Sequence, residues 1–203
     1  MAKNLENYET FMDRMEIHFP HLKCVLIGIF YRFLKNEFRS FRRKSETNPD
    51  GSQMRYFEHL RRVVLILLDE AGLVDLQAVF VALAHDAIED TRITLEEITV
   101  LCGASVSKRV ALCSKVPEQG FMKRLEMHGD WIVLAVKVAD RIDNLRTLGN
   151  DPTFRAKQIA ETTEKYPKIV YLMVARAPSG PKLDACLRLQ SIFDETLEQA
   201  KSA

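Results

Sequence analysis

The residues best suited to chemistry lie between residues 84 and 91, where a histidine is followed at once by an aspartate. His85 and Asp86 offer two metal ligands from adjacent positions, and two further carboxylates follow at Glu89 and Asp90. On a helix, residues three and four apart are surface neighbours, so this segment can place a metal and a general acid or base over one turn. The spacing therefore suggests metal-assisted chemistry with a carboxylate close to the reacting group.

A polar helix end is the simpler interpretation of the same four residues, because acidic side chains are common on solvated faces. Against that interpretation, residues 79–84 are almost wholly apolar, so the cluster emerges from a segment that we expect to be buried. The motif then needs further ligands from elsewhere in the chain.

Two other positions can supply them. Asp140 lies in the apolar stretch 136–141, where an unpaired carboxylate is costly. It is either part of a buried salt bridge, with Arg141 or Lys137, or a metal ligand. His59 lies among arginines on another expected helix, and an isolated histidine of this kind is more often a surface or structural residue.

Together these positions form one mixed nitrogen and oxygen ligand set. Its members are His59, His85, Asp86 and Asp140. Two imidazoles with two carboxylates suit Mn²⁺, Fe²⁺ or Zn²⁺ and are too rich in nitrogen for Ca²⁺. Such a site lowers the pKa of bound water and polarises a phosphoryl oxygen, while Glu89 and Asp90 move protons. The implied reaction is hydrolysis of a phosphoester or phosphoanhydride.

The elements that must hold these residues read as helices throughout, so we predict an all-α fold. Apolar residues recur at helical spacing, and no alternating strand pattern of convincing length is present. Asp75 is the expected N-cap of the helix that leads into the motif, and Thr94 with Glu97 forms a capping box. The expected helices span residues 3–19, 22–41, from 54, from 76, from 94, 105–115, from 121 through 139, 153–164, 167–175 and 182–200.

Aromatic and basic residues alternate over residues 38–44, after which residues 45–53 form the clearest loop. The basic cluster is either a solvated helix C-terminus, where cations offset the helix dipole, or an anion clamp at the mouth of a site. The sequence patterns alone leave both interpretations open.

Composition narrows the class of protein. The chain has 203 residues, 47% of them hydrophobic and 28% charged, with a formal net charge of +1. This balance gives no general case for nucleic-acid or membrane binding, and the length suits a single domain. No secretory signal is recognised, and the four cysteines are widely spread, so we expect a cytoplasmic protein with reduced thiols.

The order His59, His85-Asp86, Asp140 resembles that of the HD metal-dependent phosphohydrolase superfamily. Within it, the motifs at 85–91 and 136–148 look like the hydrolase domain of the RelA/SpoT group, which hydrolyses the alarmone (p)ppGpp. The resemblance covers about residues 38–170. It implies an HD-domain helical bundle, preceded by N-terminal helices over 1–37 of undetermined role and followed by a C-terminal helix over 182–200.

The resemblance also implies a role for each matching residue. The implied ligands of a catalytic metal, typically Mn²⁺, are His59, His85, Asp86 and Asp140. Glu89 and Asp90 would position and activate the water that attacks the 3′-pyrophosphate. The implied substrate-binding residues are Arg43, Lys44, Asn144 and Thr147, which favours the anion-clamp interpretation of the basic cluster.

Two departures from the family pattern bear on the substrate. The first histidine of the family usually lies between prolines, whereas residues 54–60 contain none. Family members often carry histidine where this chain has Asp143, so we expect an extra acidic group beside the nucleotide that changes base or phosphate preference.

The leading prediction is thus a stand-alone (p)ppGpp 3′-pyrophosphohydrolase that acts on a nucleotide and releases pyrophosphate. We expect no synthetase domain, because no room remains for one after residue 203, and the N-terminal helices complete the bundle or form a dimer surface. The alternatives are another HD phosphohydrolase, acting on a nucleotide monophosphate, a cyclic nucleotide or NADPH, and a non-catalytic alarmone-binding protein.

Overall fold

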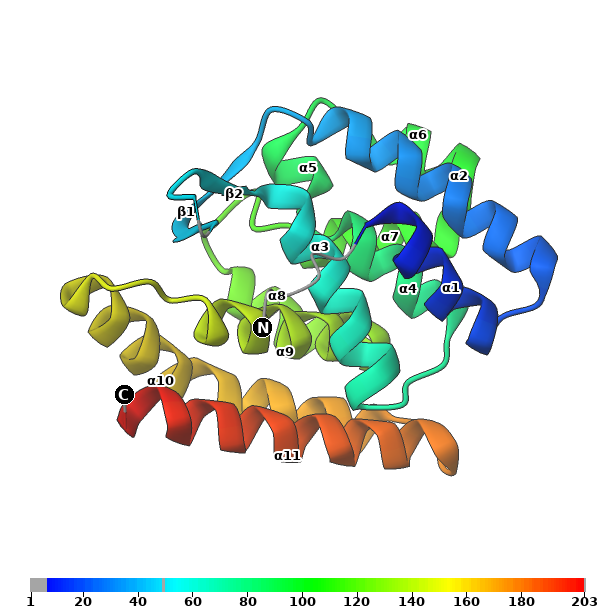
Figure 1. Cartoon of the computed structure of the whole chain (residues 1–203). Helices are drawn as coiled ribbons and strands as arrows, with labels where there is room; N and C mark the ends of the chain where they lie inside the picture. The colour runs from blue at the N-terminus through cyan, green and yellow to red at the C-terminus, as the bar shows by residue number, and fades with distance from the viewer. Residues whose placement is uncertain (1–6, 49, 203) are drawn as a thin grey trace.

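The computed structural model describes residues 7–48 and 50–202 as a bundle of helices with one small β-hairpin (Figure 1). The predicted all-α class is confirmed. The helices are α1 Tyr8–His18, α2 His21–Glu37, α3 Tyr56–Leu65, α4 Leu76–Ala84, α5 Ala87–Asp90, α6 Leu95–Cys102, α7 Ala104–Cys113, α8 Phe121–His128, α9 Trp131–Arg146, α10 Pro152–Arg176 and α11 Pro181–Ser202. A π-helical turn, η1 Ile66–Glu70, extends α3.

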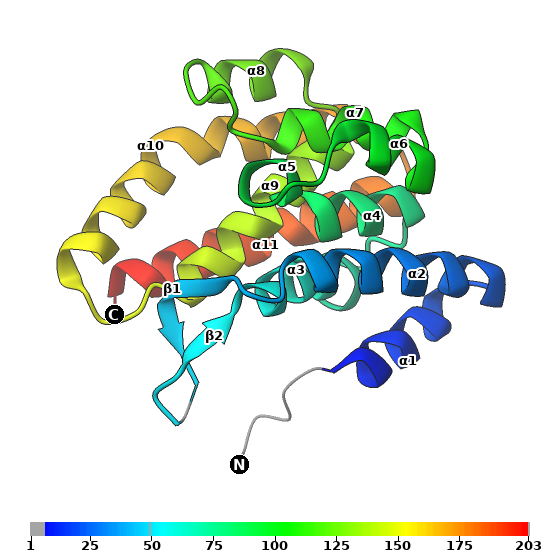
Figure 2. The ribbon, with the colours of Figure 1, turned by 90° about the horizontal axis from the view of Figure 1, so that it is seen from above.

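Helix α9 is the central element of the bundle. It packs against α3, α4, α7, α10 and α11, and nearly all of its side chains are buried. Figures 1 and 2 show it enclosed between α11 on one side and α3 and α4 on the other. Polar side chains on such a helix lie in the core, where they need compensating partners.

The predicted helix over 22–41 ends early, and a β-hairpin takes up part of the loop predicted over 45–53. Helix α2 ends at Glu37, and β1 Arg42–Thr47 pairs antiparallel with β2 Gln53–Arg55. The strands carry mostly charged and polar side chains, so the apolar alternation that identifies a strand in the sequence is missing here. The expected loop is confined to the turn, where Gly51 adopts a positive φ of 82° and donates its N–H to Asn48 O.

Two other boundaries differ from the sequence prediction. The pattern expected to run on from residue 121 is divided, because Asp130 caps a new helix by accepting the N–H of Val133. Residues 153–175 form one helix instead of two, with Pro167 in its interior. Proline removes one backbone hydrogen bond without ending a helix that tertiary contacts hold, and α10 curves around the bundle (Figure 2).

The predicted caps beside the motif are confirmed. Asp75 accepts the N–H groups of Gln77 and Ala78, and Thr94 with Glu97 forms the reciprocal capping box of α6. Within residues 7–48 and 50–202, no helix is long and apolar enough to cross a membrane. The expected helix over 3–19 is observed from Tyr8, and residues 3–6 lie outside the described residues.

Candidate metal centre

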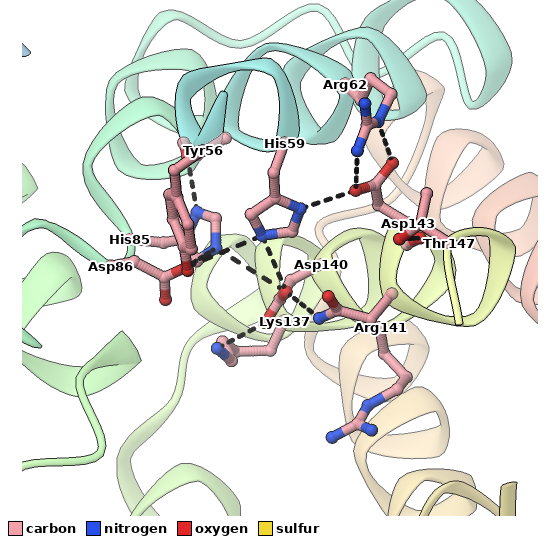
Figure 3. Close-up of polar contacts among 12 residues, drawn as sticks. Tyr56, His59, Arg62, His85, Asp86, Lys137, Asp140, Arg141, Asp143 and Thr147 are labelled. Atoms are coloured by element: carbon pink, nitrogen blue, oxygen red, sulfur yellow. Dashed lines mark hydrogen bonds and ion pairs between the residues drawn. The ribbon is translucent and has the colours of Figure 1, made fainter. Parts of the chain in front are cut away.

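Three helical segments bring the predicted metal ligands together (Figure 3). His59 comes from α3, His85 and Asp86 from the end of α4, and Asp140 from α9. His59 Nε2 lies 3.3 Å from Asp140 Oδ1, and His85 Nε2 lies 3.1 Å from Asp86 Oδ2. The other two separations between a histidine and a carboxylate are 3.7 Å between His59 Nε2 and Asp86 Oδ2 and 3.8 Å between His85 Nε2 and Asp140 Oδ1. One ligand atom each of His59, His85 and Asp140 lie within 4.8 Å of one another, close enough to share a single cation. Asp86 lies beside His85 but outside this group of three.

We expected the motif to lie on one continuous helix, but its backbone is interrupted. Helix α4 ends at Ala84, and Asp86 has φ −106° and ψ 1° before the single turn α5 begins. Asp86 precedes α5 and its carboxylate faces both histidines, whereas Glu89 and Asp90 lie on α5. The four polar residues of the motif therefore divide into two groups.

The hydrogen bonds of the imidazoles leave the inward nitrogens available. His85 Nδ1 lies 2.7 Å from the carbonyl oxygen of Ala82, which accepts only, so Nδ1 carries the proton. His59 Nδ1 lies 2.6 Å from Asp143 Oδ2 and donates likewise. Both Nε2 atoms are buried and have no hydrogen-bond partner. Two orphaned imidazole nitrogens facing carboxylates fit a metal ion well.

Asp140 forms the salt bridge that its sequence context suggested, and its second oxygen remains directed toward the histidines. One oxygen, Oδ2, lies 2.7 Å from Lys137 Nζ, and the other, Oδ1, faces the histidines. Lys137 is completely buried, so the ion pair compensates both charges in the core. Arg141, the other suggested partner, instead stacks over Tyr166 and hydrogen-bonds Gln158.

The carboxylates make the centre strongly attractive to positive charge. Burial disfavours the charged form of His59, but the nearby carboxylates of Asp140, Asp143 and Asp86 outweigh it and raise the pKa of His59 to about 10. Against the same effect of burial, Asp86 and Asp140 raise the pKa of His85 to about 9. Protons and metal ions therefore compete for the same two nitrogens.

Asp143 does not lie where we expected it. It is only 1% exposed, so it cannot touch a bound nucleotide directly. One carboxylate oxygen accepts from His59, while Arg62 Nε lies 2.6 Å from the other, Oδ1 (Figure 3). Arg62 also binds Glu46 on β1, at 2.7 Å. Asp143 thus lies on the far side of His59 from the predicted ligands, and through Arg62 it connects His59 to the hairpin.

Three of the four predicted substrate-binding residues meet beside this centre. Arg43 is buried and donates to Asn144 Oδ1 at 2.7 Å and to Thr147 Oγ1 at 3.3 Å. Asn144 in turn donates to Asp140 Oδ1 at 2.6 Å. Lys44 is exposed on the hairpin and forms no hydrogen bond or ion pair with the described part of the chain. The structure therefore groups Arg43 with the centre and leaves Lys44 outside that group.

The two predicted catalytic carboxylates lie on α5, half-buried beside the ligands. Glu89 accepts the backbone N–H of Lys115. Burial raises the pKa of Glu89 and of Asp90, and the negative charge of Asp86 adds to the effect. A carboxylate whose pKa is raised is a stronger base than an exposed one, which suits proton transfer.

Sequence reasoning missed two neighbours of the ligands, Tyr56 and Arg62. The Tyr56 hydroxyl donates to Asp86 Oδ2 at 2.6 Å, and its ring stacks on Phe38. Tyr56 and Arg62 each lie three residues from His59 along α3, so the i,i+3 rule would have placed both on the face of that histidine.

Comparison with known proteins identifies the fold around this centre. A family model described as "HD domain" matches residues 39–169. The human guanosine-3′,5′-bis(diphosphate) 3′-pyrophosphohydrolase MESH1 is 33% identical over 119 residues, which cover 54% of this chain and 64% of that protein. The GTP pyrophosphokinase rsh of Brucella melitensis is 31% identical over 171 residues, or 78% of this chain and 22% of that protein.

One solved structure is similar to this chain over most of its length. It is described as a metazoan ortholog of SpoT that hydrolyses ppGpp and plays a role in starvation responses. It superposes with a TM-score of 0.62 at 26% identity, covering 87% of this chain and 97% of that one. The chain spans about a fifth of the Brucella relative and less than two thirds of the human one. Because the family model covers well over half of the sequence and includes the four predicted ligands, the chain belongs to the HD domain family.

Proposed function

We propose that this protein is a metal-dependent phosphohydrolase that removes the 3′-pyrophosphate of guanosine 3′,5′-bis(diphosphate) or a related alarmone. The observation that carries the proposal is the pair of buried, unpartnered Nε2 atoms that face Asp86 and Asp140. The names of the human relative and of the solved structure support the choice of substrate.

In this proposal His59, His85, Asp86 and Asp140 hold a divalent metal, with Mn²⁺ as the preferred ion. When bound, such an ion supplies Lewis-acid polarisation of a phosphoryl oxygen and lowers the pKa of bound water. His59 keeps its proton on Nδ1 because Nδ1 donates a hydrogen bond to Asp143. His85 keeps its proton on Nδ1 because Nδ1 donates to the carbonyl oxygen of Ala82.

The carboxylates of α5 then handle the protons of the reaction. Glu89 or Asp90 accepts a proton from the attacking water as the new bond to phosphorus forms. The bond between that phosphorus and the 3′-oxygen breaks, the 3′-oxygen gains a proton, and pyrophosphate leaves. Arg43 would bind the nucleotide's phosphates, and its hydrogen bonds to Asn144 and Thr147 beside the centre support this role.

The decisive experiment is a nucleotide panel with identification of the products. Purified protein with Mn²⁺ is incubated with ppGpp, pppGpp, ppApp, nucleoside monophosphates, a cyclic nucleotide and NADPH. We expect pyrophosphate from the 3′-pyrophosphorylated nucleotides only. Release of orthophosphate from another nucleotide would instead identify a different HD phosphohydrolase.

A second measurement distinguishes an enzyme from an alarmone-binding protein without turnover. Metal content and ppGpp binding are compared between the wild type and Asp86→Ala. We expect the wild type to bind one metal ion per chain and Asp86→Ala to bind much less. Tight ppGpp binding with equal metal content and no product would favour the binding protein.

A further inference from the structure

A second concave site lies on the hairpin, outside the metal centre. It is a cavity of about 810 Å³ between the end of α2, the hairpin and the start of α3. Its apolar wall includes the buried rings of Phe38 and Phe57, and none of the predicted metal ligands or catalytic carboxylates lines it. Its polar lining is dominated by cations, although the whole chain has a net charge of only +1.

The two strands oppose like charges at this cavity. Arg42 and Arg55 are direct cross-strand partners in the hairpin, and both line the cavity. Like charges directly opposite each other destabilise a strand pair. Arg42 donates only to the carbonyl oxygens of Arg39 and Phe41, and Arg55 forms no side-chain hydrogen bond or ion pair within the described residues.

Two more cations, Lys35 and Arg39, enter the cavity from the end of α2. Cations at a helix C-terminus offset the helix dipole, so these two alone would be ordinary. The two acidic residues of the lining are engaged elsewhere. Asp50 accepts the N–H and hydroxyl of Ser52 in the turn, and Glu58 pairs with Arg61. Four cations of the lining therefore have no carboxylate partner among the described residues.

The size and chemistry of the cavity indicate what would neutralise these cations. A volume of this size suits a small molecule, and a concave site suits one better than a long polymer. Guanidinium groups bind phosphate oxygens bidentately and stack on flat rings. We propose that Lys35, Arg39, Arg42 and Arg55 form a binding site for a compact polyphosphate, either inorganic or carried by a nucleoside.

The test measures binding and does not depend on hydrolysis. Inorganic triphosphate and GTP are each titrated calorimetrically into the full chain, in a buffer with a chelator that removes divalent metals. The test variant is Arg39→Gln with Arg55→Gln, because neither side chain bonds another described residue. The control variant, Arg92→Gln with Lys108→Gln, removes two exposed cations outside the cavity.

We expect saturable binding of one triphosphate to the wild type and to the control variant. The test variant should bind at least about tenfold more weakly, because two charged hydrogen-bonding groups are lost. Tighter binding of GTP than of triphosphate would add a nucleoside subsite, and equal binding would restrict recognition to the phosphates.

Three results would overturn the proposal. The first is the absence of saturable binding, and the second is equal weakening of binding in the test and control variants. The third is a loss of binding in Arg43→Gln while the test variant binds as tightly as the wild type. The last result would place the anion in the metal centre instead. Thermal unfolding shows whether the test variant is folded, and without ligand it should melt no lower than the wild type because the Arg42–Arg55 repulsion is relieved.

Discussion

Replacing Asp143 tests whether the metal centre depends on the group behind His59. In Asp143→Leu the side chain keeps its branched shape but loses the oxygen that accepts from His59 Nδ1 at 2.6 Å. Neutral His59 can then carry its proton on Nε2, the nitrogen that faces Asp86 and Asp140. Metal binding must first return that proton to Nδ1, which leaves a buried donor without an acceptor.

The expected size of the effect follows from that hydrogen bond. A buried bond to a charged group contributes about 1.5–3 kcal/mol. Loss of an outer partner of a ligating histidine typically lowers metal affinity about 10- to 100-fold, which corresponds to about 1.4–2.8 kcal/mol. The two values agree, so we expect Asp143→Leu to bind Mn²⁺ about 10- to 100-fold more weakly. Asp143→Asn keeps an acceptor oxygen and should lose less.

The assay is competition for Mn²⁺ with a metal-sensitive dye, using metal-free protein at constant pH. Leu189→Ala is the control, because it opens a cavity in the core on α11 and lowers the free energy of unfolding without touching the centre. Its affinity for Mn²⁺ should match that of the wild type. Folded Asp143→Leu with an affinity within about twofold of the wild type, less than 0.5 kcal/mol, would refute the reasoning.

Three further predictions concern neighbouring residues. Glu89→Gln should lower kcat about 10²- to 10⁴-fold while the affinity for Mn²⁺ stays unchanged, measured by pyrophosphate release and dye competition; loss of metal binding would contradict its proposed role. Burial raises the pKa of Glu89 and Asp90, and each must be ionised to act as a base. As the pH decreases, kcat/KM of the metal-loaded enzyme should therefore begin to fall while the pH is still above ~4.5. A value of kcat/KM that stays constant down to that pH would contradict this. Lys137→Met leaves Asp140 without its buried cation and should lower the free energy of unfolding by about 3–5 kcal/mol in a chelator. Denaturant titration should show a smaller loss with Mn²⁺, and an equal loss in both buffers would indicate that no cation reaches Asp140.

The sequence predicted the site better than the hairpin beside it. Histidine and aspartate in an apolar setting need compensating partners, so these residues were candidate metal ligands, and the structure brings the candidates together. The hairpin from Arg42 to Arg55 is rich in charged residues and has no apolar alternation. Its strands are held by a turn and by contacts with α9, such as that of Arg43 with Asn144, and these contacts are not encoded in local spacing.

The position of Asp143 illustrates the same limit. Its neighbour Asn144 matches the family motif, which led us to expect Asp143 beside the nucleotide as well. Adjacent residues on a helix point about 100° apart, so the two side chains face different neighbours. Asn144 faces Asp140 and Arg43, while Asp143 faces His59 and Arg62.

By itself, the sequence determined the helical class, the caps of α4 and α6, and which histidines and aspartates were candidates for the centre. These depend on periodicity, local hydrogen bonding and the cost of burying charge, which are properties of short segments. Only the tertiary structure decided which nitrogen of His59 faces inward, because that depends on a carboxylate 84 residues away in the sequence. Contacts between distant segments packed around α9 select one arrangement of the predicted ligands from the several that the residue types allowed.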